Sequence, residues 1–180
     1  MDIKYGYFCH CGNIVNVKII TCLGIRNKRD RFGNGYITVT DDPKINYRNA
    51  LYASKNFKII SCEDTKGRSK NIKVVNKYIQ DKTREQDRPF TIYFRIEKEI
   101  VFAECINYLF FNDEGKLKNE NFPYNHSGYI TLYDDYGRIS DVFYNDSGRY
   151  EGNRKIYENG NIKYDFNYRR QKKWEANKLF

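Results

Sequence analysis

The chain has 180 residues, of which 17% are aromatic and 31% charged, and its formal net charge at pH 7 is +9. This length predicts one domain, or one domain with an appended repeat, and is enough to bury a real core. The longest apolar runs are only a few residues, which excludes a transmembrane helix, and the first residues do not resemble a secretory leader. The positive charge suits a nucleic acid, an anionic membrane or an acidic protein as partner, although a solvated, lysine-rich surface explains it equally well.

Five cysteines, at positions 9, 11, 22, 62 and 105, are odd in number and irregular in spacing. We therefore predict free thiols in a reducing, intracellular compartment, the cytoplasm. Cys9, His10 and Cys11 together suggest zinc, but Cys-x-Cys is not the spacing of a two-residue zinc knuckle and no second close pair follows. In a strand, Cys9 and Cys11 would point to the same face as small core residues. We predict neither a metal site nor a cofactor.

The first 65 residues predict strands joined by loops, as the 17 Tyr and 12 Phe of the whole chain also favour. Alternating or β-branched stretches predict strands at 13–20, 36–40 and 57–62, with a turn at 33–35. Residues 25–31 are expected to form a basic loop between the first strand and this turn.

Residues 66–88 are crowded with Lys and Arg. Ile72, Val75 and Ile79 fall at helical spacing, which predicts a short amphipathic helix at about 72–82, although Val74-Val75 also suits a strand. Residues 83–88 are expected to be a charged linker, and Pro89 prevents a helix from continuing. We therefore divide the chain into an N-terminal β-rich region, 1–88, and a second region, 89–180.

The second region begins with a strong strand pattern at 90–96. A turn at 97–99 then predicts a second strand at 100–103, and a helix over 97–108 is the competing interpretation.

Five times between Phe111 and Gly160, an aromatic residue is followed by polar residues and a glycine. These segments are 111–115, 124–128, 133–137, 144–148 and 157–160. Their glycines are 13, 9, 11 and 12 residues apart, about the length of one strand plus a tight turn. Ile139 shares a strand face with Phe143, and the last strand alternates so that one face carries Ile162, Tyr164, Phe166 and Tyr168. We expect a meander of hairpins with one covered and one wet face.

Segments 110–117, 132–139 and 156–162, with 144–152 as a bridging half, resemble MORN-type repeats in the variant of bacterial antitoxin-like proteins and large DNA viruses. The resemblance covers about 108–170, roughly a third of the chain. The resemblance implies either a viral assembly or host-interaction protein, which a virion would also contain, or an antitoxin-like partner. MORN-type repeats are also linked to membrane association. Residues 35–42 parallel residues 128–135, which indicates either a diverged repeat in the N-terminal half or only shared turn chemistry.

Two basic stretches supply the candidate binding residues. The C-terminal tail places four positive charges beside the only tryptophan: Arg169, Arg170, Lys172, Lys173 and Trp174. These side chains are suited to binding phosphate, a stacked base or a membrane surface. In the alternative interpretation, Trp174 and Phe180 cap the apolar face of the last hairpin. The second stretch lies within 66–88 and consists of Lys66, Arg68, Lys70, Lys73 and Lys77.

No catalytic residue is predicted. His126 falls in a turn, where local hydrogen bonding explains it more simply than catalysis. The pairs Asp41-Asp42 and Asp134-Asp135 also fall in turns, which explains them more simply than a cation site. We predict a mainly β fold, in which an antiparallel meander of MORN-like hairpins follows an N-terminal β-rich region with at most one or two short helices. The preferred function is a non-enzymatic structural or protein-interaction module. The alternative is a nucleic-acid-binding protein that uses 26–31, 66–88 and 169–174. Sheet edges also permit self-association.

Overall fold

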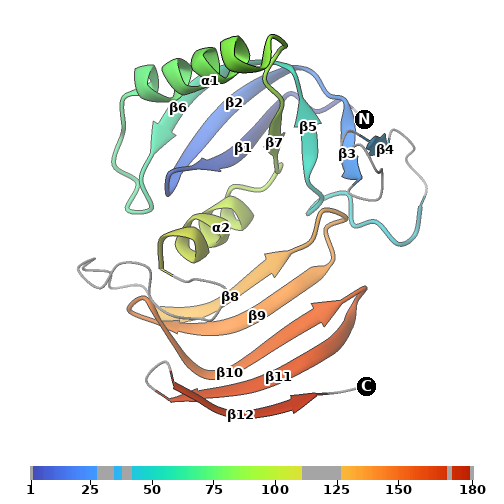
Figure 1. Ribbon diagram of the computed structural model, residues 1–180, viewed down its shortest axis with the longest axis vertical. Helices are drawn as coiled ribbons and strands as arrows, with labels where there is room; N and C mark the ends of the chain where they lie inside the picture. Colours follow the sequence, from blue (N-terminus) through green and yellow to red (C-terminus); the bar gives the residue numbers. More distant parts are fainter. Residues whose placement is uncertain (1, 28–34, 38–41, 111–126, 170–171, 179–180) are drawn as a thin grey trace.

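The computed structural model describes residues 2–27, 35–37, 42–110, 127–169 and 172–178. Over these ranges the protein is mainly β, with three antiparallel sheets and two helices, which confirms the predicted fold class. Figure 1 shows the elements in layers along the long axis of the molecule: helix α1, the N-terminal sheets, helix α2 and the five-stranded meander.

The N-terminal part contains two sheets joined along one side. The first has the order β1 (Tyr5–His10), β2 (Asn13–Thr21), β6 (Asn56–Glu63). The second has the order β4 (Gly35–Ile37), β3 (Gly24–Asn27), β5 (Tyr52–Ser54), β7 (Ile92–Phe94). Two 2.8 Å backbone hydrogen bonds between Tyr7 and Arg95 connect the sheets.

The strands predicted at 13–20 and 57–62 are confirmed as β2 and β6. The expected loop at 25–31 is wrong for its first residues, which form β3. Ile25 is buried and pairs with both Ile37 and Tyr52, so tertiary pairing decides its conformation. Of the strand predicted at 36–40, Tyr36 and Ile37 lie in β4; its remainder, and positions 33–34 of the predicted turn, lie outside the described residues.

Helix α1 (Ile72–Gln86) confirms the predicted helix but is longer than expected. The Asn71 side chain accepts a hydrogen bond from the backbone N–H of Lys73 at 2.9 Å and so caps the first turn. The linker expected at 83–88 is wrong, since the helix continues to Gln86. Asp87 then ends it in the left-handed conformation, with its N–H directed at the carbonyls of the last turn.

Helix α2 (Lys98–Phe110) replaces the strand expected at 100–103, so the competing helical interpretation is the correct one. Its β-branched residues suit a strand, but here they pack on two sides. Val101 and Cys105 pack on Ile14 of β2, and Ile106 packs on Phe143 and Tyr150 of the meander. A helix between two layers is apolar around much of its surface, which hides the helical period. Strand β7 covers only the middle of the stretch predicted at 90–96.

The meander contains β8 (Ser127–Tyr133), β9 (Ile139–Asp146), β10 (Arg149–Glu158), β11 (Asn161–Arg169) and β12 (Lys172–Lys178), paired in chain order. Three of the predicted aromatic-to-glycine turns join its strands, at 133–137, 144–148 and 157–160. Ser147-Gly148 and Asn159-Gly160 have positive φ at both positions, as two-residue hairpin turns of type I′ require. The segment 111–115 and most of 124–128 lie outside the described residues.

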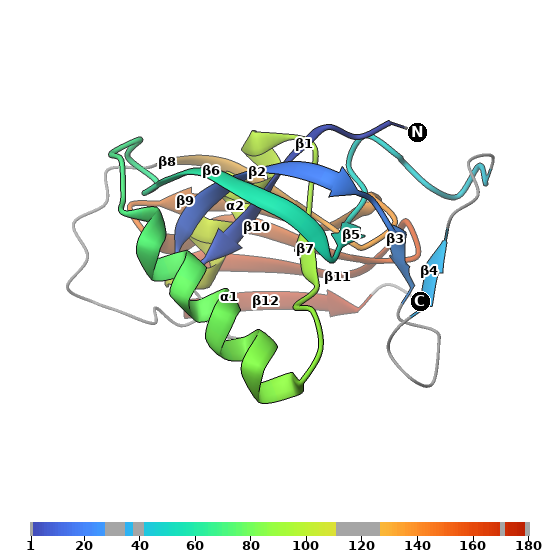
Figure 2. The ribbon, with the colours of Figure 1, turned by 90° about the horizontal axis from the view of Figure 1, so that it is seen from above.

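One face of the meander is covered by α2, as Figures 1 and 2 show. On β11 the aromatic residues share one face, as predicted: Tyr164 stacks on Phe166, and Phe166 and Tyr168 pack into the same cluster. Burial does not alternate along this strand, since residues 162–167 are all half-buried. On β9, Phe143 is fully buried, whereas Ile139, which was predicted to share its covered face, is 40% exposed at the start of the strand.

One turn geometry occurs in both halves of the chain. Asp64-Thr65-Lys66-Gly67-Arg68 follows β6, and Asp134-Asp135-Tyr136-Gly137-Arg138 joins β8 to β9. In each, the first Asp accepts 2.9 Å hydrogen bonds from the backbone N–H two and four residues later, and its other oxygen binds the Arg Nε. In each, the Gly has a positive φ and donates its N–H to the Asp carbonyl.

Candidate functional site

The two predicted basic patches lie at opposite ends of the molecule, α1 at one and β12 at the other (Figure 1). Arg169 ends β11 and is exposed, Lys172, Lys173 and Trp174 belong to β12, and Arg170 lies outside the described residues. Trp174 therefore lies in a strand, and both its predicted roles, as a binding residue or as a cap of the last hairpin, stay predictions. The structure does not bring these patches together.

Ion pairs use part of the second patch. Arg68 and Lys70 both bind the Asp64 carboxylate, at 2.7 and 3.6 Å, while Lys66, Lys73 and Lys77 are exposed. Burial disfavours the charge of Asp64, yet hydrogen bonds from Arg68 and Lys66 lower its pKa to about 2. Two of the predicted binding residues thus share the single negative charge of Asp64.

The predicted segment 26–31 is described only at its start. The Arg26 guanidinium lies 4.3 Å from the centre of the Tyr93 ring and 3.8 Å from an Asp135 oxygen. Residues 28–31 lie outside the described residues.

The cysteine cluster differs from the expected arrangement. Cys9 lies in β1 and packs on Cys105 of α2, whereas Cys11 is an exposed turn residue with a φ of 49°. Cys9 and Cys11 therefore do not share a strand face, because the Cys11-Gly12 turn ends β1 first. A hydrogen bond with Cys105 lowers the pKa of the Cys9 thiol. Among the described residues, no three His, Cys, Asp or Glu side chains gather closely enough to hold a metal ion.

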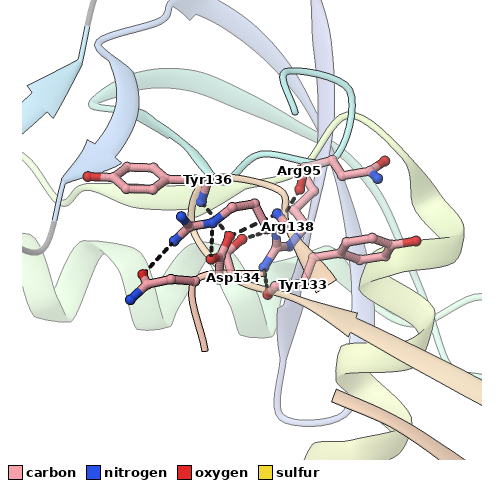
Figure 3. A network of polar contacts seen from close by, with 7 residues as sticks. Arg95, Tyr133, Asp134, Tyr136 and Arg138 are labelled. Carbon is pink, nitrogen blue, oxygen red and sulfur yellow. Dashed lines mark hydrogen bonds and ion pairs between the residues drawn. The ribbon is translucent and has the colours of Figure 1, made fainter. Parts of the chain in front are cut away.

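Arg95 joins the N-terminal part to the meander and is only 3% exposed. Its Nε donates to Glu104 at 2.5 Å, and its terminal nitrogens donate to the carbonyls of Asn49, Tyr133 and Asp134 at 2.6, 2.9 and 3.1 Å. Figure 3 shows the Arg95 guanidinium beside Tyr133 and Asp134, with Arg138 nearby. Burial raises the pKa of Glu104, an effect that Arg95 opposes. Because all three nitrogens bind the protein itself, Arg95 is a structural clamp and not an anion site.

Asp134 performs the turn chemistry expected of it. Its carboxylate accepts hydrogen bonds from the N–H groups of Tyr136 and Arg138 and from Arg138 Nε, as Figure 3 shows. The turn docks on the 46–51 segment through Asn46 N–H to Tyr136 O at 2.8 Å and Leu51 N–H to Asp135 O at 3.0 Å.

A groove of about 520 Å³ lies between β6 and α1. A larger hollow, of about 680 Å³, lies where the 43–49 segment meets the β8–β9 turn. One wall of the groove is the start of β6 with the residue before it, Lys55 to Ile59; the other wall is α1 with the following loop. Phe57, Ile72, Ile79 and Phe90 are half-buried and give the groove its apolar surface. The exposed amides of Asn76 and Gln80 lie along the helical wall. We call this feature the α1–β6 groove.

The groove reaches the outer edge of β6. Successive side chains of a strand point to opposite faces of the sheet. Because five successive residues, Lys55 to Ile59, all line the groove, it meets the strand at its edge and not on one face only. On its inner side β6 pairs with β2. On its outer side the 69–70 segment covers only the far end, through the Glu63–Ser69 bridge and Lys70 N–H to Cys62 O at 2.8 Å. Within the described residues, no strand pairs with the outer edge of Asn56–Ser61.

The groove is basic at its rim. Lys55 and Lys58 are exposed, and the described part of the chain contains no acidic partner for either. Lys58 also lies directly opposite Lys18 of β2. Like charges at facing positions of a sheet repel each other. Residues 55–90 contain ten Lys and Arg against five Asp and Glu, so the groove lies in a positive field.

Sequence reasoning found the strand and the helix that form this groove but not the groove itself. The patch residues Lys73 and Lys77 do not line the groove, whereas Asn76, Gln80 and Thr83 of the same helix do. The spacing of these three at i, i+4 and i+7, next to Ile72 and Ile79, was the available signal. It shows a mixed helix face without showing which strand faces it.

The fold thus defines a mainly β protein of three antiparallel sheets with two helices, within the described ranges. No protein-family model, curated protein or solved structure matches it significantly. Neither helix in the described part of the chain is long and apolar enough to cross a membrane.

Proposed function

We propose that this protein is a non-enzymatic interaction module that binds a partner polypeptide in the α1–β6 groove. The observation that carries the proposal is an unpaired strand edge that lies beside half-buried apolar side chains. An open strand edge is a ready template for another chain, and proteins normally cover or protect it. Partner binding is one way in which this edge is covered.

The MORN resemblance supports a scaffold role for the meander. Glycines at its turns, aromatic residues on its covered face and the Asp-centred turn are all structural features. The same turn after β6 favours a common origin for parts of the two halves. Under this proposal the meander and Arg95 hold the N-terminal part rigid, and the groove performs the binding.

The test is site-specific photo-crosslinking in the cells that naturally make the protein. A benzophenone side chain replaces Gln80, which lines the groove, or Lys77, an exposed residue of the same helix that does not. We expect Gln80 to crosslink a discrete polypeptide and Lys77 to crosslink it at least about tenfold less. Equal crosslinking from both positions, or no polypeptide adduct at Gln80, would contradict the proposal.

Nucleic-acid binding is the second candidate, and the exposed Lys66, Lys73 and Lys77 favour it. The pairing of Arg68 and Lys70 with Asp64 and the separation of the patches weigh against it. Retention of labelled single- and double-stranded oligonucleotides at low salt, lost steeply as salt is added, would support this function. Absence of retention at low salt would remove it.

A further inference from the structure

We propose that the α1–β6 groove binds an extended peptide of alternating acidic and apolar residues, which adds to β6 as a fourth strand of its sheet. This inference rests on the proposed function and names the class of partner. It follows from the residues that a neighbouring strand on β6 would face.

The backbone of β6 provides the template. The segment Asn56–Ser61 pairs with β2 on one side and, within the described residues, with no strand on the other. Six residues of strand extend about 20 Å, long enough to specify a short peptide. Main-chain hydrogen bonds supply affinity in this mode, and alternate side chains supply specificity.

The face toward α1 selects apolar residues. Phe57 and Ile59 lie on this face, opposite Ile19 and Val17 of β2, and pack in the main core cluster. Ile79 and Phe90 are half-buried beside them and line the same groove. A peptide side chain facing Phe57 or Ile59 would therefore enter an apolar site beneath α1, and its burial would be favourable.

The opposite face selects acidic residues. Lys58, between Phe57 and Ile59, points away from them and faces Lys18 across β2. An added strand would place its own residue opposite Lys58 on the outer side, at a Cβ separation of about 5 Å. A carboxylate there would relieve the repulsion between two lysines, and Lys55 would favour a second acid. The partner therefore alternates apolar, acidic, apolar opposite residues 57, 58 and 59.

The experiment uses the full chain and a fluorescein-labelled eight-residue peptide that alternates Val and Glu, with binding followed by fluorescence anisotropy. We expect saturable binding, and loss of at least about tenfold in affinity with the Lys55→Glu/Lys58→Glu variant. Lys77→Glu, the same charge reversal on α1 outside the groove, should change affinity less than about twofold. A peptide that alternates Val and Lys should not bind.

N-methylation separates strand addition from simple charge attraction. In an antiparallel pair, alternate N–H groups face the partner strand. Methylating the amides of one set, Val or Glu, should abolish binding, and methylating the other set should leave it within about twofold. Equal effects of the two sets, or equal effects of the groove and Lys77 variants, would overturn the inference.

The outcomes also separate this inference from the proposed function. If Gln80 crosslinks a polypeptide but the Val-Glu peptide neither binds nor competes, the partner class is wrong and the interaction module stands. If the peptide binds in the expected way but no polypeptide is crosslinked, the groove has the inferred specificity and the proposed cellular function fails. Lys58→Glu removes the repulsion from Lys18, so we expect this change not to weaken the pairing of β6 with β2.

Discussion

Gly137 lies where the meander packs against the backbone of the N-terminal part. Its φ is +76°, and a Cβ there would lie 2.2 Å from the carbonyl oxygen of Asn46 and 2.8 Å from the backbone nitrogen of Ala50. Gly160 has a similar φ of +84°, but a Cβ there would meet nothing within 4 Å. The two glycines therefore separate the requirement for a left-handed backbone from the requirement for space.

Gly160→Ala should cost about 1–2 kcal/mol of unfolding free energy, the strain of a left-handed alanine. Gly137→Ala should cost clearly more, because the new methyl group also displaces the backbone of the 46–50 segment. Urea denaturation of both variants measures the difference. Equal losses would show that the docking of this turn contributes nothing to stability.

The Asp64 carboxylate should make the free energy of unfolding depend on pH. Its pKa of about 2 lies below the value for an unfolded chain, so its contribution is present at neutral pH and is lost as the pH falls from about 4 to about 2. Asp64→Asn should therefore lower the unfolding free energy by about 1–3 kcal/mol at pH 7, and the gap from wild type should narrow over this pH range. Chemical denaturation at several pH values checks this, with exposed Asp2→Asn as the control. A gap independent of pH would contradict the role of the Asp64 charge.

At the scale of elements, Arg95 connects β7, α2 and the β8–β9 turn. Arg95→Met should cost about 3–5 kcal/mol, because it leaves the half-buried Glu104 carboxylate and three carbonyls without their donor. The double variant with Glu104→Gln should be more stable than the sum of the single losses predicts. Thermal and urea unfolding of the four proteins provides the cycle, and strict additivity would exclude the clamp.

The strands were predictable where one face is buried and the other wet. Ile162, Tyr164, Phe166 and Tyr168 alternate with polar residues, and Asn159-Gly160 identifies the turn before them. Helix α2 was not predictable with the same clarity, because contact with two layers places apolar residues around it. The start of α1 at Ile72 was predicted, but its C-terminal end was missed, because the charged residues 83–86, read as a linker, continue the helix as far as its cap at Asp87.

The candidate site was less accessible from the sequence than the elements. Lys58 is an ordinary polar residue in an alternating strand, and its importance comes from lying opposite Lys18 at an open edge. Strand order determines which edge is open, and here β6 pairs with β2, about 40 residues earlier in the chain. Charge counting instead selected Arg68 and Lys70, which both pair with Asp64.

At the scale of the whole molecule, the two ends of the long axis have different roles under our proposals. The meander and α2 form a rigid base, fixed to the N-terminal sheets by Arg95 and the Asp134 turn. The α1–β6 groove lies at the other end, away from this junction (Figure 1). A partner could thus occupy the groove without disturbing the contacts that hold the layers together.

Hydrogen exchange of the full chain, followed by mass spectrometry with and without the alternating Val-Glu peptide, tests the central claim most directly. Strand addition would place the amides of one edge in new hydrogen bonds, so exchange should slow in fragments covering 55–61 and in the facing residues 76–83 of α1. Exchange in the meander should be unchanged. Protection confined to β8–β12, or no protection at saturating peptide, would contradict the account.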